Sequence, residues 1–434
     1  MIKIATFQSD ATPPLGSPLC MGLVKPVKKI VEPLLARGLV ILGNEAPVVI
    51  CTVDWVEIRN SGHDYWRKVL AEAADTTIER VTIHTHHPHD TPGYCFSQKD
   101  LTDLKAIAGI MEDTSFAENV ALAAAKALHS ALASAKPVTH YGYGKAKVSQ
   151  VASNRRILGN DGRVAQTRWS SCTDKALRDL PEGLIDPWLQ NLSFWNGEEP
   201  LASLTYYATH PQSFYGDGAV NPDFVGLARS IRESTLPEVA HLHFDGCGGN
   251  IAAGKYNDHS PKNRLILAQR LLKGMEAAWA KTRKYPLKDS DFCWRVKPVA
   301  LPVSALILKQ TENDLLKTIN NVDEAKNTRI IAAFELIWKR RRQSGCLIDL
   351  SCLRLGKISV LHLPGEMLIE YQLAARQMRP SAPVLVAAYG DCGPGYVGTK
   401  KSYAEGGYET SQQASHVAPE VEEVIMEAMR ELLR

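Results

Sequence analysis

Four histidines stand within six residues, in the run His84-Thr85-His86-His87-Pro88-His89. The alternation in Arg80-Val81-Thr82-Ile83-His84 predicts a strand that leads directly into this run. Because side chains alternate along a strand, we expect His84 and His86 to point to one side and His87 to point away. Neutral imidazoles that face one pocket suit zinc or a similar divalent metal. The run therefore predicts a metal site, and a set of hydrogen-bonded loop histidines is the alternative.

A metal needs further ligands from elsewhere in the chain. His210 is the natural second ligand, because it ends another predicted strand in Tyr207-Ala208-Thr209-His210-Pro211. Glu366 stands out among the acids, since it follows Pro364-Gly365 after a buried strand and is expected to open a helix at a sheet edge. Capping that helix is its alternative role. Spacing alone leaves several other acids open as ligands, namely Asp90, Asp217, Asp223, Asp245 and Asp391.

Several familiar catalytic patterns do not occur in the sequence. It contains no GxSxG elbow and no HExxH helix, which argues against serine hydrolases and zincins. The glycine-rich loops at 246–249 and 393–395 match neither GxGxxG nor GxxxxGK[ST]. A nucleotide site is therefore not indicated.

The composition is that of a globular protein with a large core. Hydrophobic residues make up 45% of the 434-residue chain, and the net charge is +3, which indicates no nucleic-acid partner. The start, Met1 to Phe7, lacks the apolar run of a signal peptide, and no apolar run approaches the length of a membrane span. The nine cysteines form no CxxC pair. We therefore expect a cytoplasmic protein with reduced thiols and no membrane span.

Strand and helix signals are mixed along the whole chain. Strands are expected at 2–7, 37–43, 47–54, 80–84, 201–209, 240–244, 358–363 and 383–389, and helices at 64–74, 116–133, 221–235, 262–281, 306–342, 366–378 and from 418. Gly43-Asn44-Glu45 predicts a hairpin turn between two of the strands. The pattern predicts an α/β fold, a mixed β-sheet core flanked by helices with the metal site at strand ends. We expect a single domain, 1–434, with a helical insertion near 300–345.

Taken in order, these motifs resemble the catalytic N-terminal domain of the neutral/alkaline (non-lysosomal) ceramidase family. Ile83-His84-Thr85-His86 is similar to the family's T-H-T-H metal strand, and His210 falls where the family has its second metal histidine. The other similar segments are Asp10-Ala11-Thr12-Pro13-Pro14-Leu15-Gly16, Asn154-Arg155, Gly248-Gly249-Asn250-Ile251, Leu363-Pro364-Gly365-Glu366, Tyr396-Val397-Gly398-Thr399, Tyr403 and Tyr408-Glu409. The third of these departs from the family's G-D-V-S-P-N.

The resemblance implies a zinc-dependent amidohydrolase that uses a metal-activated water to cleave a linear N-acyl amide, in a small N-acylated or lipid-like substrate. The resemblance also implies that His86 accepts or relays the proton of that water, and that Arg155 and Tyr408 stabilise the oxyanion. The zinc ligands that the resemblance implies are His84, His210, Glu366 and Tyr396.

The sequence also departs from the family. It ends soon after the Tyr408 segment, so we expect no counterpart of the family's C-terminal immunoglobulin-like domain. The metal strand continues His87-Pro88-His89-Asp90 where the family has S-G-P, so the pocket mouth is expected to differ. Two other readings stay open: a metal-dependent hydrolase of an ester, lactone or sugar-derived substrate, and a metal-binding protein without turnover. The sequence makes no prediction about oligomeric state.

Overall fold

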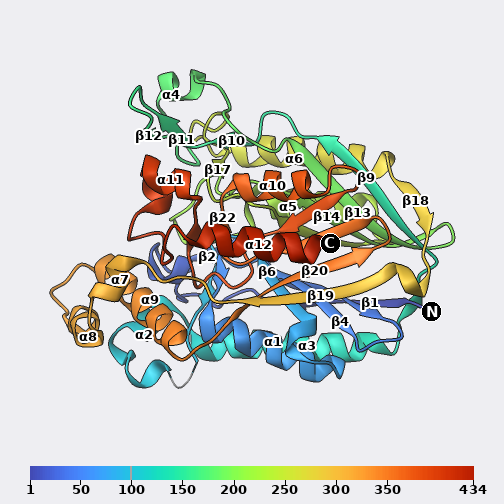
Figure 1. The fold of residues 1–434 in the computed structure, drawn as a ribbon, viewed down its shortest axis with the longest axis horizontal. Helices are drawn as coiled ribbons and strands as arrows, with labels where there is room; N and C mark the ends of the chain where they lie inside the picture. Colours follow the sequence, from blue (N-terminus) through green and yellow to red (C-terminus); the bar gives the residue numbers. More distant parts are fainter. Residues whose placement is uncertain (98–99) are drawn as a thin grey trace.

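The computed structural model describes residues 1–97 and 100–434. In these residues, twelve α-helices surround three larger β-sheets and several two-stranded ones (Figure 1). The predicted mixed α/β class is therefore confirmed.

The first sheet holds the histidine-rich strand at its edge. Its strands, in the order β6-β4-β3-β1-β8, are β6 (Val81–Thr85), β4 (Val48–Val53), β3 (Leu35–Leu42), β1 (Lys3–Asp10) and β8 (Lys136–Pro137). The predicted hairpin joins β3 and β4 antiparallel, and β6 then runs parallel to β4. The helices α1 (Asn60–Ala74) and α3 (Thr114–Leu132) lie side by side and cover one face of this sheet (Figure 1).

The second sheet leads to His210. Its order is β16-β14-β13-β9-β18, formed by β16 (Ala240–Asp245), β14 (Glu199–Tyr207), β13 (Trp188–Asn196), β9 (His140–Lys147) and β18 (Arg283–Pro286). The strands β14 and β16 are parallel, so their carboxyl ends lie at the same edge. The helices α5 (Asp223–Thr235) and α6 (Lys262–Ala280) pack on the outer face.

The third sheet leads to Glu366. Its order is β19-β20-β21-β23, formed by β19 (Phe292–Val299), β20 (Ile348–Leu355), β21 (Ile358–His362) and β23 (Val384–Ala387). The strands β21 and β23 are parallel. The helices α10 (Ile369–Met378) and α12 (Val421–Leu433) pack on it, and α12 crosses the front of the molecule in Figure 1.

The three sheets share one apolar core. Alternate residues of each strand face it, as Ile4 and Ile50 do from the first sheet, Phe194 from the second and Leu353 from the third. The intervening residues face the outer helices. Each sheet has one pair of parallel strands, β4–β6, β14–β16 and β21–β23. Because all three pairs end near this core, the fold brings their carboxyl-terminal ends together.

The prediction of one long helix at 306–342 is wrong. The structure has three helices there, α7 (Ala305–Lys309), α8 (Glu312–Asn320) and α9 (Lys326–Gln343). A capping box between Thr311 and Asp314 starts α8 afresh, which breaks the helical run that the apolar spacing suggested. That the chain forms a single domain, 1–434, with a helical insertion near 300–345 stays a prediction.

The remaining elements are short. They are β2 (Lys29–Ile30), β5 (Glu57–Ile58), β7 (Gly93–Tyr94), β10 (Ser153–Asn154), β11 (Arg156–Leu158), β12 (Val164–Thr167), β15 (Ala219–Val220), β17 (Ile251–Ala252), β22 (Glu366–Met367), β24 (Tyr396–Val397), α2 (Lys105–Met111), α4 (Lys175–Asp179), α11 (Lys400–Glu405) and the 3-10 turns Cys20–Gly22, Ile78–Arg80, Asp100–Thr102, Asp289–Asp291 and Tyr408–Thr410. None of the helices in the described ranges has the length and apolar character that crossing a membrane requires. All nine cysteines are free thiols.

Candidate metal centre

Three buried side chains meet just beyond the strand ends. His87 follows β6, His210 follows β14, and Glu366 follows β21. Their ligand atoms all lie within 4.8 Å of one another. The short parallel pair β22–β24 places Tyr396 beside Glu366, with the Tyr396 hydroxyl 3.2 Å from Nε2 of His210. Each of the three larger sheets thus contributes to one cluster.

The hydrogen bonds of the two imidazoles direct their lone pairs inward. Nδ1 of His87 donates to the carbonyl of Val56 at 2.9 Å, and Nδ1 of His210 donates to that of Gly248 at 2.7 Å. A neutral imidazole protonated at Nδ1 presents a lone pair at Nε2. Both Nε2 atoms face one carboxylate oxygen of Glu366, at 3.3 Å from His87 and 2.9 Å from His210. Converging lone pairs and a carboxylate form the donor set of a divalent cation, so these residues can hold a metal.

Burial and neighbouring charges set the protonation of this cluster. Burial opposes ionisation of Glu366, but the neighbouring His87, His210 and Arg155 outweigh it and lower the pKa of Glu366 to about 2. Burial lowers the pKa of His87, which favours its neutral form, although Glu366 acts against this. Burial also raises the pKa of Tyr396 well above its ordinary value, although Arg155 opposes this. A bound cation would act in the same direction as Arg155 and favour the tyrosinate.

Two backbone turns in the left-handed region present the ligands. His87 has φ +62°, and its N–H donates to the carbonyl of Trp55 at 3.0 Å. Gly365 has φ +60°, and a Cβ there would lie 2.6 Å from the carbonyl oxygen of Gly395. This close approach lets the N–H of Glu366 donate to the same carbonyl, so Glu366 belongs to β22 and α10 begins only at Ile369. The expectation that Glu366 opens a helix is therefore wrong.

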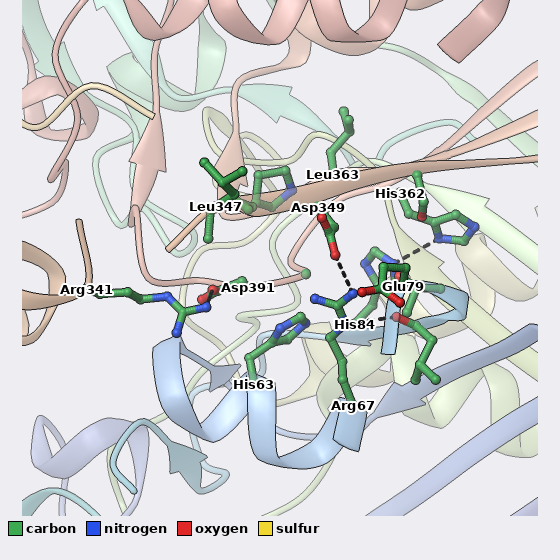
Figure 2. Close-up of a pocket in the computed structure, with 16 residues that line it drawn as sticks. His63, Arg67, Glu79, His84, Arg341, Leu347, Asp349, His362, Leu363 and Asp391 are labelled. Atoms are coloured by element: carbon green, nitrogen blue, oxygen red, sulfur yellow. Dashed lines mark hydrogen bonds and ion pairs between the residues drawn. The ribbon is translucent and has the colours of Figure 1, made fainter. Parts of the chain in front are cut away.

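The structure does not bring His84 into this cluster. His84 lies at a separate pocket of about 20 Å³. Figure 2 shows it beside His362 and near the Arg67–Asp349 ion pair. Nδ1 of His84 donates to the carbonyl of Ala388 at 2.7 Å, so Nε2 is the acceptor, and it lies 3.0 Å from Nδ1 of His362. The lone pair of His84 is thus already used inside the protein.

His86 also lies away from the cluster. Its Nε2 is 3.4 Å from Asp54 and 3.3 Å from Nη1 of Arg229, at a site between the sheets. The rings of His84 and His86 both face β16, since they lie 5.7 Å from Phe244 and His243 respectively. The two histidines therefore share a side of the strand as expected, but that side faces the protein interior.

His89 is a site residue that the sequence motifs did not single out. Its Nε2 lies 3.4 Å from Nε2 of His87 and accepts a hydrogen bond from Gln212 at 2.6 Å. Burial lowers the pKa of His89 well below its ordinary value. The signal for His87 and His89 was the four-histidine run itself, which does not tell which members share the pocket.

A pocket of about 450 Å³ opens onto the cluster. Its polar end is formed by His87, His89, Glu366, Tyr396 and Tyr408. Another part of its wall is apolar and comes from the 3-10 turn Cys20–Gly22, the residues that follow it and α9, with Met21, Leu23, Val24, Ile331 and Phe334. The helical segment near 300–345 thus forms part of the pocket wall.

Arg155 and Tyr408 lie together beside Tyr396. The guanidinium of Arg155 is 5.2 Å from the ring of Tyr396 and 5.6 Å from that of Tyr408. Its Nε donates to Glu409 at 2.6 Å, and its Nη2 is buried with no hydrogen-bond partner in the described residues. Tyr408 is 37% exposed, but loss of water around its hydroxyl raises its pKa to about 12, so the hydroxyl stays a donor at neutral pH. The structure thus groups Arg155, Tyr396 and Tyr408 with His210 and Glu366.

Comparisons with known proteins bear on the fold. No protein-family model and no curated protein matches the sequence. Among solved structures, the chain is similar to neutral ceramidase from Pseudomonas aeruginosa and to a ceramidase complexed with C2. Each match has a TM-score of 0.72 at 14% sequence identity and covers 100% of this chain and 74% of the other. The resemblance drawn from the sequence motifs is confirmed at the level of the fold: over its whole length, this chain has the fold of the neutral ceramidase structures.

Proposed function

We propose that this protein is a zinc-dependent hydrolase of the ceramidase kind that cleaves a linear N-acyl amide. The observation that carries the proposal is the buried cluster of His87, His210 and Glu366, with Tyr396 beside it, at the polar end of a pocket. In this proposal His87 takes the ligand position expected for His84. Two imidazoles, a carboxylate and a phenolate are a donor set that suits zinc.

The metal, when bound, would supply a water of lowered pKa and would polarise the amide carbonyl. The protein's own residues would do the rest. Nη2 of Arg155 and the hydroxyl of Tyr408 would donate hydrogen bonds to the carbonyl oxygen as negative charge develops on it. The proton released from water would pass to the leaving nitrogen at the polar end of the pocket, where His89 lies. A C–O bond forms, the C–N bond breaks, and the products are a carboxylate and an amine.

The apolar wall of the pocket supports an acyl group as the part of the substrate next to the carbonyl. Met21, Ile331 and Phe334 would remove the chain from water. Burial of each methylene contributes about 0.8 kcal/mol, so a chain of several carbons binds usefully. The substrate we propose is therefore a lipid-like amide.

Metal analysis of the purified protein tests the proposal. We expect about one zinc per chain in the wild type and its loss in His210→Ala, together with the loss of hydrolysis of medium-chain N-acyl amides. Metal in the wild type without hydrolysis of any amide would favour a non-catalytic metal-binding protein. A wild type that binds no zinc, even when zinc is supplied, would contradict the proposal.

Replacement of Tyr408 by phenylalanine is expected to lower kcat by roughly 10- to 100-fold without loss of metal. The hydroxyl would stabilise developing charge and is not a ligand in this proposal, and loss of one such donor costs up to about 10³-fold. Steady-state kinetics and elemental analysis of Tyr408→Phe measure both effects. Tyr285→Phe, in the distant strand β18, is the matched control and should leave kcat unchanged. Equal kcat values for Tyr408→Phe and the wild type would remove this role.

A further inference from the structure

A buried arginine lines the same pocket outside the candidate metal centre. Arg59 follows β5 and is 4% exposed. Its backbone N–H donates to the carbonyl of Tyr94 at 2.8 Å, and the next N–H, that of Asn60, donates to Asp391 at 2.7 Å. The guanidinium therefore projects from a backbone that is held on both sides.

The guanidinium of Arg59 is stacked on an aromatic ring. Its central carbon lies 3.9 Å from the ring centroid of Phe334, which α9 supplies to the pocket wall. Stacking occupies one face of the planar group and leaves its N–H bonds free in the plane. Such a stacked guanidinium suits bidentate binding of a carboxylate.

The donors of Arg59 are only partly used by the protein. Nη1 lies 3.1 Å from Oε2 of Glu57, and Nε is buried without a hydrogen-bond partner in the described part of the chain. Arg229, which is also buried and also has an Nε without a partner in the described residues, differs in that each of its two Nη atoms donates to Asp54, at 2.6 and 2.7 Å. An arginine has five N–H donors, so Arg59 keeps capacity for a second anion on its Nε edge.

The position of Arg59 relates it to the reacting centre. Glu57 lies between the two, with Oε1 3.9 Å from Nδ1 of His87 and Oε2 3.1 Å from Arg59. Nε2 of His87 in turn lies 3.3 Å from Glu366. Arg59 is thus one carboxylate away from the candidate metal ligands.

We propose that Arg59 binds a carboxylate of the substrate, so that the amides this protein cleaves are N-acylated amino acids. The inference rests on the proposed function and specifies its substrate class. The acyl chain would lie along the apolar wall and the amino acid carboxylate against Nε and an Nη atom of Arg59. Hydrolysis would then release a fatty acid and a free amino acid.

Paired substrates test this specificity without any mutation. N-lauroylglycine and N-lauroylglycinamide have the same chain and the same scissile bond, and they differ in the carboxylate alone. We expect kcat/KM to favour the acid by roughly 10- to 100-fold, the range for a hydrogen-bonded charge. Calorimetric binding of both compounds to chelator-treated protein, which has no turnover, is expected to show the same order.

Variants assign the preference to Arg59. In Arg59→Met the acid-to-amide ratio of kcat/KM and of binding is expected to fall to about one. The double variant Glu57→Gln/Arg59→Met avoids leaving Glu57 buried without its partner and should give the same ratio if the single variant folds poorly. Arg283→Met, at the exposed start of β18, is the control and should keep the wild-type ratio.

The outcomes separate this inference from the proposed function. Equal cleavage and equal binding of acid and amide by the wild type would overturn the role of Arg59 and leave the hydrolase proposal standing. An acid preference that survives in the double variant would overturn it as well. Tighter binding of the acid, lost in both variants but without hydrolysis of either compound, would support the carboxylate site and contradict the hydrolase.

Discussion

Replacing His87 by alanine is expected to remove the bound metal and the hydrolytic activity, whereas replacing His84 is expected to leave the metal in place. Nε2 of His87 faces Glu366, while Nε2 of His84 is turned to His362. Loss of even an outer partner of a metal ligand costs roughly 10- to 100-fold in metal affinity, so loss of a ligand should cost more than about 100-fold.

Elemental analysis and thermal unfolding of His87→Ala and His84→Ala measure the difference. His84→Ala should keep about one metal per chain but lose about 1–3 kcal/mol of stability, because the carbonyl of Ala388 and the ring of His362 would each lose a partner. Each variant serves as the control for the other. Metal retained by His87→Ala and lost by His84→Ala would show that the ligand expected from the sequence motif was the right one.

Replacing Arg229 by methionine is expected to lower the free energy of unfolding at neutral pH by about 3–5 kcal/mol. Arg229 donates two hydrogen bonds to Asp54, a carboxylate with no exposed surface, beside His86. Breaking a buried ion pair by removing one partner leaves an uncompensated charge, which is the cause of this cost. Urea unfolding measures it, with Arg232→Met on the same helix as the control.

The stability difference between the wild type and Arg229→Met should become smaller as the pH falls. Burial opposes ionisation of Asp54, but Arg229 outweighs it and lowers the pKa to about 2, below the value of about 3.9 for an unfolded chain. The ion pair therefore stabilises the wild type above pH 4 and loses that contribution as the pH falls towards 2. In Arg229→Met burial dominates and the pKa of Asp54 rises, so the difference between the proteins should shrink on acidification.

The double variant Asp54→Asn/Arg229→Met completes this test. It removes the charge that the single variant leaves unpaired, so it should recover part of the lost stability. A single variant as stable as the wild type at neutral pH would contradict the importance of this pair. A constant stability difference from pH 7 to pH 3 would contradict the role of Asp54 in it.

Local patterns in the sequence determined the elements and the location of the chemistry. The turn at Gly43-Asn44-Glu45 and the helix expected at 262–281, found as α6, depend on neighbouring residues and were predicted correctly. The helix expected at 306–342 failed because apolar spacing continues across the capping box at Thr311. The histidine run pointed to the candidate centre, and ordered motifs suggested its grouping with His210, Glu366 and Tyr396.

Only the tertiary structure decided which histidine faces the pocket. Alternation along β6 assigns His84 and His86 to one side, but the other two sheets determine that this side is interior. The left-handed turn at His87 depends on the carbonyl of Trp55, which no local pattern specifies. Arg59 likewise belongs to no motif. Its place in the pocket depends on stacking against Phe334, which the distant helix α9 supplies. The periodicity of the sequence determines which residues share one face of a helix or strand. A site also depends on which other elements pack against that face.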